Sequence, residues 1–301
     1  MDPEALAVWY GRFVAENLHL AWSPRQPLSG QEFCEALAIL AAGSGAFGFV
    51  ALQQFVANGN LVGRVADGER WPCVGVAFGH LRHAQGPFPQ YDGRAAQGFL
   101  PWMTGTEVFP QVILGMRGPE AEEIYALVDS TNRPSFRHSA PMDLIACTGT
   151  GTVSVDVVEL LVDEKSILKR DPAGTFARND PLGVLYQTPL MVGCVRACHE
   201  IINFSPRVSN ASRARCELKT EILLRSIHNG FEYCLASEGK RLRAELGDFA
   251  VRLARLAVMA SGGGGLVRGH PAQRLYREAL LYSLMAQTDD IVNQAFQEVL
   301  L

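Results

Sequence analysis

The first sixty residues carry apolar side chains at helical spacing. From Leu6 to Val14 they fall on one face of a helix, and a second apolar run begins at Phe33. Residues 36–63 contain no charged side chain, and this stretch approaches the length of a membrane-spanning helix. However, Gly43-Ser44-Gly45 interrupts it, and no cluster of Lys or Arg flanks it. We therefore predict that residues 4–62 are helical and include two short buried helices rather than a membrane span.

The pattern changes to short β-rich runs between residues 71 and 168. Polar residues and valines alternate strictly over residues 152–157, as they do in a strand with one buried face. Gly86-Pro87 and Gly118-Pro119 separate the runs, and such dipeptides mark turns. This region is predicted to be an antiparallel β domain.

Helical spacing returns after Asp171-Pro172. Four helical segments are expected, over residues 182–202, 212–236, 240–259 and 271–301. The predicted fold class is α+β. Its three domains are N-terminal helices over residues 1–70, the β domain over residues 71–170 and a C-terminal helical bundle over residues 171–301.

The amino-acid composition of the chain limits the kinds of function that it can have. The chain has 301 residues, of which 48% are hydrophobic and 19% charged, and its net charge is −4. Nucleic-acid binding normally requires a basic excess, so we expect small-molecule ligands and neither a nucleic acid nor a membrane as partner. The seven cysteines are odd in number and widely spaced, and the acidic start Met1–Glu4 does not resemble a secretory signal. A cytoplasmic location is expected.

Two segments carry candidate ligand chemistry. Gly262–Gly265 precedes a predicted helix, and glycines leave backbone amides free for close approach to a diphosphate; the alternative is a flexible turn. Trp102 and Thr104 are two residues apart on a predicted strand, so both can face the same side. A flat ring system could stack there, although the alternative is that Trp102 belongs to the core.

A cationic cluster follows a buried strand at His80, Arg82 and His83. In a strand, His80 and Arg82 would share one face. His80 is a candidate anion ligand or general acid or base, because imidazole titrates near neutrality; the alternative is a solvated strand end. Cys194 and Cys198 lie one helical turn apart. Zinc needs further ligands that the spacing does not supply, so we predict no metal site.

The order of helices, β domain and helices resembles that of the acyl-CoA dehydrogenase superfamily. Pro101-Trp102-Met103-Thr104-Gly105 is similar to the Trp-Ile-Thr segment of that family. The resemblance implies a β-barrel-like central domain and FAD as cofactor. It also implies that Trp102 packs against the flavin ring and that the Thr104 hydroxyl lies near its reactive nitrogen.

A second similarity concerns the C-terminal region. Gly262-Gly263-Gly264-Gly265-Leu266 resembles the family's Gly-Gly-x-Gly-aromatic segment, which implies that Gly262, Gly263 and Gly265 bind the cofactor. Without a gap in spacing, Ala286-Gln287-Thr288 then stands where the family has Glu-Gly-Thr. The resemblance places Thr288 near the adenosine end of the cofactor.

The departures from the family bear on catalysis. The family's usual catalytic base is the Glu of Glu-Gly-Thr, and Ala286 cannot remove a proton. Some members place the base on a neighbouring helix, so Glu200, which follows such a helix, is a candidate relocated base. The family's Arg-x-x-Phe-Gly segment, which helps to hold the cofactor of an adjoining subunit, has no match in residues 203–210.

The leading hypothesis is a flavin-associated oxidoreductase that acts on a specialised acyl thioester or related substrate. One alternative is a monooxygenase of the same fold that uses reduced flavin and oxygen, since such relatives do not need the Glu that Ala286 replaces. Another is a non-catalytic binding or scaffold protein that has lost flavin. The family pairs its C-terminal bundles, and residues 280–301 are largely apolar, so a homodimer or homotetramer is expected.

Overall fold

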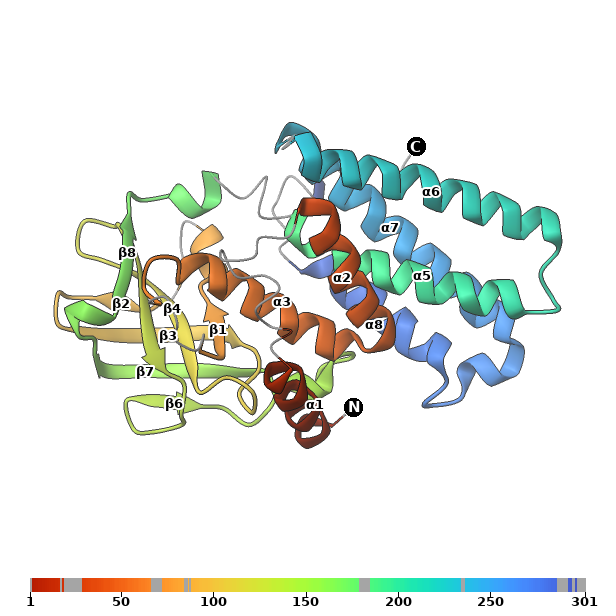
Figure 1. Ribbon diagram of the computed structural model, residues 1–301. Helices are drawn as coiled ribbons and strands as arrows, with labels where there is room; N and C mark the ends of the chain where they lie inside the picture. The colour runs from red at the N-terminus through yellow and green to blue at the C-terminus, as the bar shows by residue number, and fades with distance from the viewer. Residues whose placement is uncertain are drawn as a thin grey trace. The chain divides into compact units, whose positions relative to one another are not determined.

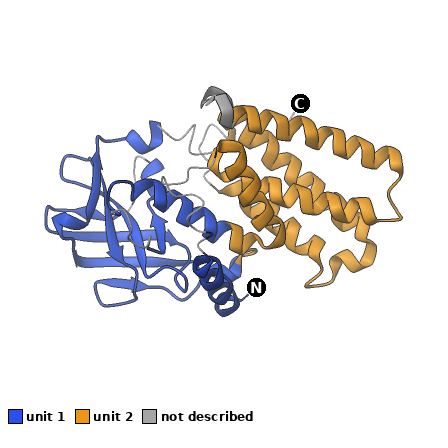
Figure 2. Ribbon diagram, viewed as in Figure 1, with its two compact units in different colours: residues 1–27, 49–144, 148–180 blue, residues 28–48, 145–147, 181–301 orange. Residues whose placement is uncertain are grey.

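A computed structural model describes residues 2–16, 18, 29–65, 72–83, 86, 88–178, 185–233, 236–285, 292–293 and 296. The chain forms two compact units (Figure 2). Unit 1 consists of residues 1–27, 49–144 and 148–180, and unit 2 of residues 28–48, 145–147 and 181–301. Along the chain, helices are followed by strands and then by helices again (Figure 1).

Three helices open the chain: α1 (Pro3–Ala15), α2 (Gly30–Gly43) and α3 (Gly45–Asn60). The start of α2 is held by a capping box, in which the Ser29 and Glu32 side chains each accept a hydrogen bond from the other's backbone amide. The charge-free stretch is divided between α2 and α3 by Ser44, as the sequence predicts. No helix in the described ranges is long and apolar enough to span a membrane.

In the described part of unit 1, eight strands form one sheet. They are β1 (Val74–Ala77), β2 (Gln90–Tyr91), β3 (Ala95–Met103), β4 (Gln111–Arg117), β5 (Glu123–Asp129), β6 (Phe136–His138), β7 (Val153–Leu161) and β8 (Ile167–Asp171). Their order is β6-β7-β3-β2-β4-β5-β8, and β1 pairs with β4. The alternation over residues 152–157 is confirmed as the start of β7.

The sheet is mixed, which corrects the prediction of an antiparallel domain. Both β1 and β2 run parallel to β4, whereas the other pairings are antiparallel. Alternation records which face of a strand is buried, but it holds no information about the direction of a neighbouring strand. The pairing path ends at β6 and β8 in the described part of the chain, so closure into a barrel stays a prediction.

Strand β4 is apolar on both faces because each face meets its own hydrophobic cluster. Val112 and Leu114 join the main cluster with residues of β3 and β7. Ile113 points to the other face and packs with Ala57 of α3 and with Leu61, which follows that helix. A strand covered on both sides loses polar alternation, which explains the continuous apolar run of its sequence.

The helices of unit 2 are α2, α5 (Thr188–Phe204), α6 (Asn210–Tyr233), α7 (Ala236–Ser261) and α8 (Pro271–Leu284). Small residues bring α2 and α5 close together. A Cβ placed on Gly193 of α5 would lie 2.4 Å from the carbonyl oxygen of Ala38 in α2. The two backbones can approach this closely only because position 193 has no side chain.

Candidate functional site

His80 lies in a turn of 3₁₀ helix (η2, Gly79–Arg82) that follows the buried strand, so His80 and Arg82 do not share a strand face. Strand β1 ends at Ala77. The His80 ring is buried; its Nε2 lies 3.0 Å from the carbonyl oxygen of Gly115, and its plane packs against Phe88. Burial lowers the pKa of His80 to about 4. The imidazole is therefore neutral at physiological pH, and one ring nitrogen is already engaged.

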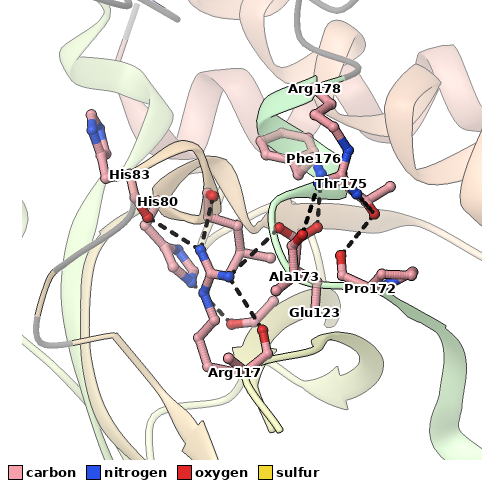
Figure 3. Close-up of polar contacts among 12 residues, drawn as sticks. His80, His83, Arg117, Glu123, Pro172, Ala173, Thr175, Phe176 and Arg178 are labelled. Atoms are coloured by element: carbon pink, nitrogen blue, oxygen red, sulfur yellow. Dashed lines mark hydrogen bonds and ion pairs between the residues drawn. The ribbon is translucent and has the colours of Figure 1, made fainter.

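The surroundings of η2 are organised by Arg117 and Glu123, which sequence reasoning missed (Figure 3). Arg117 ends β4 and donates to the carbonyl oxygens of Leu81 and His83 at 3.3 and 3.2 Å. Glu123 is fully buried and accepts from the Phe176 amide at 2.8 Å. The sequence signal that could have identified Arg117 and Glu123 is that each is a charged residue at the end of an apolar strand. Both residues tie loops to the sheet, so this region is an internal polar network.

Trp102 and Thr104 have different surroundings. Trp102 lies at a bulge of β3 opposite β7, and 44% of its surface is exposed. Thr104 is only 4% exposed, and its hydroxyl lies 3.1 Å from the Thr152 hydroxyl. Thr152 in turn contacts Thr150 at 2.9 Å. Unit 1 therefore offers an exposed aromatic ring at Trp102, while the Thr104 hydroxyl is part of a buried chain of hydroxyls.

The glycine run forms a 3₁₀ turn (η6, Gly262–Leu266) between α7 and α8. Gly262 directly follows the last residue of α7 and has a φ of +63°, a conformation that favours glycine. A Cβ on Gly265 would lie 2.6 Å from the carbonyl oxygen of Val258. In contrast, a Cβ on Gly263 or Gly264 would meet no atom within 4 Å. The helix turn requires two of the four glycines, and the other two leave open space.

A pocket of about 630 Å³ lies beside this turn in unit 2. Its lining residues come from α2, α5, α7, α8 and the loops that follow α5 and precede α8: Ala42, Ala197, Glu200, Ile201, Phe204, Ser205, Pro206, Arg207, Ala260, Ser261, His270, Pro271, Arg274 and Leu275. Glu200 is exposed. The Arg207 guanidinium lies against the turn, since a Cβ on Gly262 would be 2.8 Å from its Cζ. The structure thus brings Glu200, Arg207 and the glycine turn to one region.

Arg274 and His270, which also line the pocket, have structural roles. Both Arg274 Nη atoms donate to carbonyl oxygens at the end of α2, those of Ala42 and Gly43. His270 Nδ1 caps α8 by accepting from the Ala272 amide at 3.1 Å. Arg207 takes part in no ion pair among the described residues. It is therefore the cation of this pocket that is available to a ligand.

The remaining candidates are placed as follows. Thr288 and Ala286 lie outside the described residues. Cys194 and Cys198 are buried in α5, and the Cys194 thiol lies 3.3 Å from the carbonyl oxygen of Leu275. Within the described ranges, no group of three or more His, Cys, Asp or Glu side chains is arranged to hold a metal ion.

Comparison with known proteins finds no matching family profile and no matching curated protein. Solved structures do match. FkbI, from the biosynthesis of a methoxymalonyl extender unit, has a TM-score of 0.79 at 15% identity over 100% of this chain and 93% of its own. KijD3, solved in complex with FMN and a dTDP-sugar, has a TM-score of 0.75 at 15% identity over 97% of this chain and 86% of its own.

Butyryl-CoA dehydrogenase from Megasphaera elsdenii has a TM-score of 0.64 at 13% identity, over 91% of this chain and 82% of its own. These matches extend across both helical regions and the sheet. At this identity they establish a common architecture rather than a common reaction. The chain therefore has the fold of the acyl-CoA dehydrogenase superfamily.

Proposed function

We propose that this protein is a flavin-dependent oxidoreductase that acts on a specialised acyl thioester or a related small molecule, with FAD as its flavin. The observation that carries the proposal is the pocket of unit 2, where Arg207 packs against the glycine turn. KijD3, which shares the fold, was solved with FMN. A flavin cofactor, when bound, accepts or supplies a hydride.

The residues of the pocket fit a phosphate-bearing cofactor. Arginine recognises phosphate through several N–H donors in a fixed plane. The open backbone of Gly263 and Gly264 allows a ligand to approach closely. This arrangement also supplies a substitute for the missing Arg-x-x-Phe-Gly segment, because Arg207 reaches the glycine turn from a different local sequence. We propose Arg207 and Gly263 as phosphate-binding residues on this geometry, and Gly262 and Gly265 on the resemblance alone.

Trp102 is the proposed contact for the flavin ring, because it lies on strand β3 with 44% of its surface exposed. An exposed indole can stack on a flat ring system and gains by covering its apolar surface. Thr104 stays a prediction in this role, and its hydroxyl would have to exchange part of its contact with Thr152. Thr288, the expected contact at the adenosine end, is proposed on the resemblance alone.

The proton acceptor is proposed to be Glu200. It is exposed and lines the pocket, so a substrate can reach it, whereas His80 is enclosed and bonded to a backbone carbonyl. A carboxylate repels phosphate placed against it, so Glu200 would act on a part of the ligand that carries no phosphate. Glu200→Gln should then lower turnover and leave flavin content unchanged.

A reduced-flavin monooxygenase is the second candidate. It is favoured by Ala286, which replaces the proton-removing Glu of the dehydrogenases. The two reactions differ in their need for oxygen. A dehydrogenase bleaches its flavin when substrate is added without oxygen. A monooxygenase consumes oxygen when its flavin is reduced and places an oxygen atom in the product.

The first experiment is an absorption spectrum of the purified chain after dialysis against FAD or FMN. We expect visible flavin bands that correspond to about one flavin per chain. Arg207→Leu should weaken binding, whereas Arg225→Leu, a matched change at an exposed position of α6, should not. Trp102→Leu should weaken binding of the flavin. Absence of binding at saturating flavin would refute both oxidoreductase candidates and leave the non-catalytic binding protein.

We also propose that the chain forms a homodimer or homotetramer. Tyr276, Leu280 and Leu284 follow one another at four-residue spacing on α8 and are 37%, 37% and 57% exposed, so they present an apolar stripe that a second copy can cover. Light scattering coupled to gel filtration should give two or four chains, and a monomeric mass contradicts the proposal.

A reducing, cytoplasmic compartment is proposed from the cysteines. Cys34, Cys194, Cys198 and Cys216 are in no disulfide, as is usual where thiols are kept reduced. Fractionation of the native cell, with detection of this chain in the cytoplasmic fraction, tests this. Recovery in an oxidising compartment contradicts it.

A further inference from the structure

A buried polar cluster lies in unit 2 where α8 meets the start of α3. Glu278 of α8 is 4% exposed, and its Oε1 accepts from the Gly45 amide, the first residue of α3, at 3.2 Å. Tyr282, one turn further along α8, is 1% exposed, and its hydroxyl faces the Cys147 thiol. None of these side chains has a part in the proposed function.

The small size of Gly45 allows the side chains of Glu278 and Tyr282 to lie directly against the start of α3. A Cβ at this position would lie 2.2 Å from the Tyr282 hydroxyl oxygen and 2.6 Å from Glu278 Oε1. Cys147 adopts a left-handed backbone conformation with a φ of +55°, which is uncommon for a residue with a side chain. The cluster is therefore closely packed around the start of α3, and no room is left for bulk water at Gly45.

The charges around Glu278 do not compensate its carboxylate. Arg274 Nε lies 3.8 Å from Oε1, but both Nη atoms of Arg274 are occupied by carbonyl oxygens of α2. The second carboxyl oxygen, Oε2, is buried and has no hydrogen-bond partner among the described residues. Leaving a charged oxygen without a partner is costly in a buried site, whereas a protonated carboxyl has a smaller desolvation cost.

The neighbouring thiols and phenol carry no charge that offsets a carboxylate. Burial raises the pKa of Cys147 on its loop, Cys194 of α5 and Tyr282 of α8, so these side chains stay neutral near pH 7. The charges of Arg274 and Arg277 on α8 and the Gly45 amide of α3 favour the ionised carboxyl. Burial is the largest effect, and it raises the pKa of Glu278 to about 7.

We propose that Glu278 makes the contact between α8 and the start of α3 sensitive to pH: as a neutral carboxylic acid it is accommodated in this closely packed site, whereas its ionisation places a charge with an unpartnered oxygen there and destabilises the packing of α8. The folded chain binds the Glu278 proton more tightly than the unfolded chain does. The stabilisation is therefore complete below the unfolded pKa of 4.5 and is lost as the pH rises through about 7.

The test is urea unfolding of the full chain at pH values from 5 to 8, for the wild type, Glu278→Gln and Glu217→Gln. Gln keeps the shape of the neutral acid and cannot ionise. Glu217 is exposed on α6 and provides a matched control. With pKa values of about 7 and 4.5, the unfolding equilibrium constant of the wild type should rise roughly 70-fold over this range relative to Glu278→Gln. Glu217→Gln should follow the wild type.

Two measurements keep the proposal testable if Glu278→Gln does not fold. In the wild type, infrared difference spectra in heavy water should contain a protonated carboxyl band at pH 6 that disappears by pH 8. Labelling of Cys147 by a thiol reagent, followed by mass spectrometry, should accelerate with pH more steeply than labelling of Cys34, which is buried in α2. Parallel unfolding curves for wild type and Glu278→Gln, absence of the carboxyl band, or equal labelling slopes would overturn the proposal.

Discussion

Replacing Gly193 with Ala tests the close approach of α2 and α5. The new methyl group would lie 2.4 Å from the carbonyl oxygen of Ala38, 2.8 Å from Cβ of Ala41 and 2.9 Å from the amide nitrogen of Ala42. Two of these atoms belong to the α2 backbone and cannot rotate away. Because carbon atoms pack at about 3.5 Å or more, the two helices would have to separate by about 1 Å.

The net effect follows from two opposing contributions. Alanine gains about 0.5–1 kcal/mol over glycine inside a helix, and overpacking of a core costs about 1–3 kcal/mol or more. Gly193→Ala should therefore destabilise unit 2 by about 1–2 kcal/mol. Gly11 provides the matched control, because it lies inside α1, is exposed and would place its Cβ within 4 Å of no atom. Gly11→Ala should stabilise the chain by up to about 1 kcal/mol.

Urea unfolding followed by circular dichroism measures both variants against the wild type. Opposite signs for the same chemical change would support the packing argument. If Gly193→Ala leaves the midpoint unchanged or raises it, the helices are not in contact at this position and the reasoning is wrong. A lower unfolding midpoint in both variants would instead show that the expected gain from the helix propensity of alanine does not apply in these helices.

Three further predictions concern charge and catalysis. Burial lowers the pKa of His80 to about 4 from 6.5, so the free energy of unfolding should fall by about 3 kcal/mol as the pH drops from 6.5 through 4. His80→Gln should reduce this pH dependence in acid unfolding. An unchanged pH dependence in the variant contradicts the prediction. Glu35→Ala removes two 2.6 Å hydrogen bonds from Arg196 and should cost about 1 kcal/mol, whereas Glu217→Ala should cost almost nothing in the same assay. Ala286→Glu should confer bleaching of bound flavin by an acyl-CoA without oxygen, and no gain would show that the missing Glu is not what limits dehydrogenation.

Local structure was largely readable from the sequence. The division of the charge-free stretch at Ser44 and the alternation over residues 152–157 were both predicted, and both appear in the structure. The glycine run was expected before a helix and lies between α7 and α8. These features depend on residues within a few positions of each other, and the side-chain periods of helix and strand are properties of the local backbone.

The candidate site was readable only in part. Trp102 could be placed on a strand, but its exposure depends on which elements cover that end of the sheet. His80 was expected just after a buried strand, but the 3₁₀ turn in which it lies was not predicted. Arg117, 37 positions later in sequence, binds the carbonyl oxygens of Leu81 and His83 in and after that turn. Arg207 had no motif to identify it and became a candidate only through its contact with Gly262.

Glu278 shows most clearly which features can be predicted from the sequence and which require the tertiary structure. Its position among Leu275, Ala279 and Tyr282 on the buried face of α8 is readable from helical spacing, and a carboxylate on an apolar face is a visible anomaly. Its partner, the Gly45 amide, lies 233 positions away. The sequence by itself determines which face of a helix or strand is apolar, because that depends on near neighbours. Only the tertiary structure decides strand direction, burial of a given polar group and contacts between distant segments, because these depend on how the elements pack.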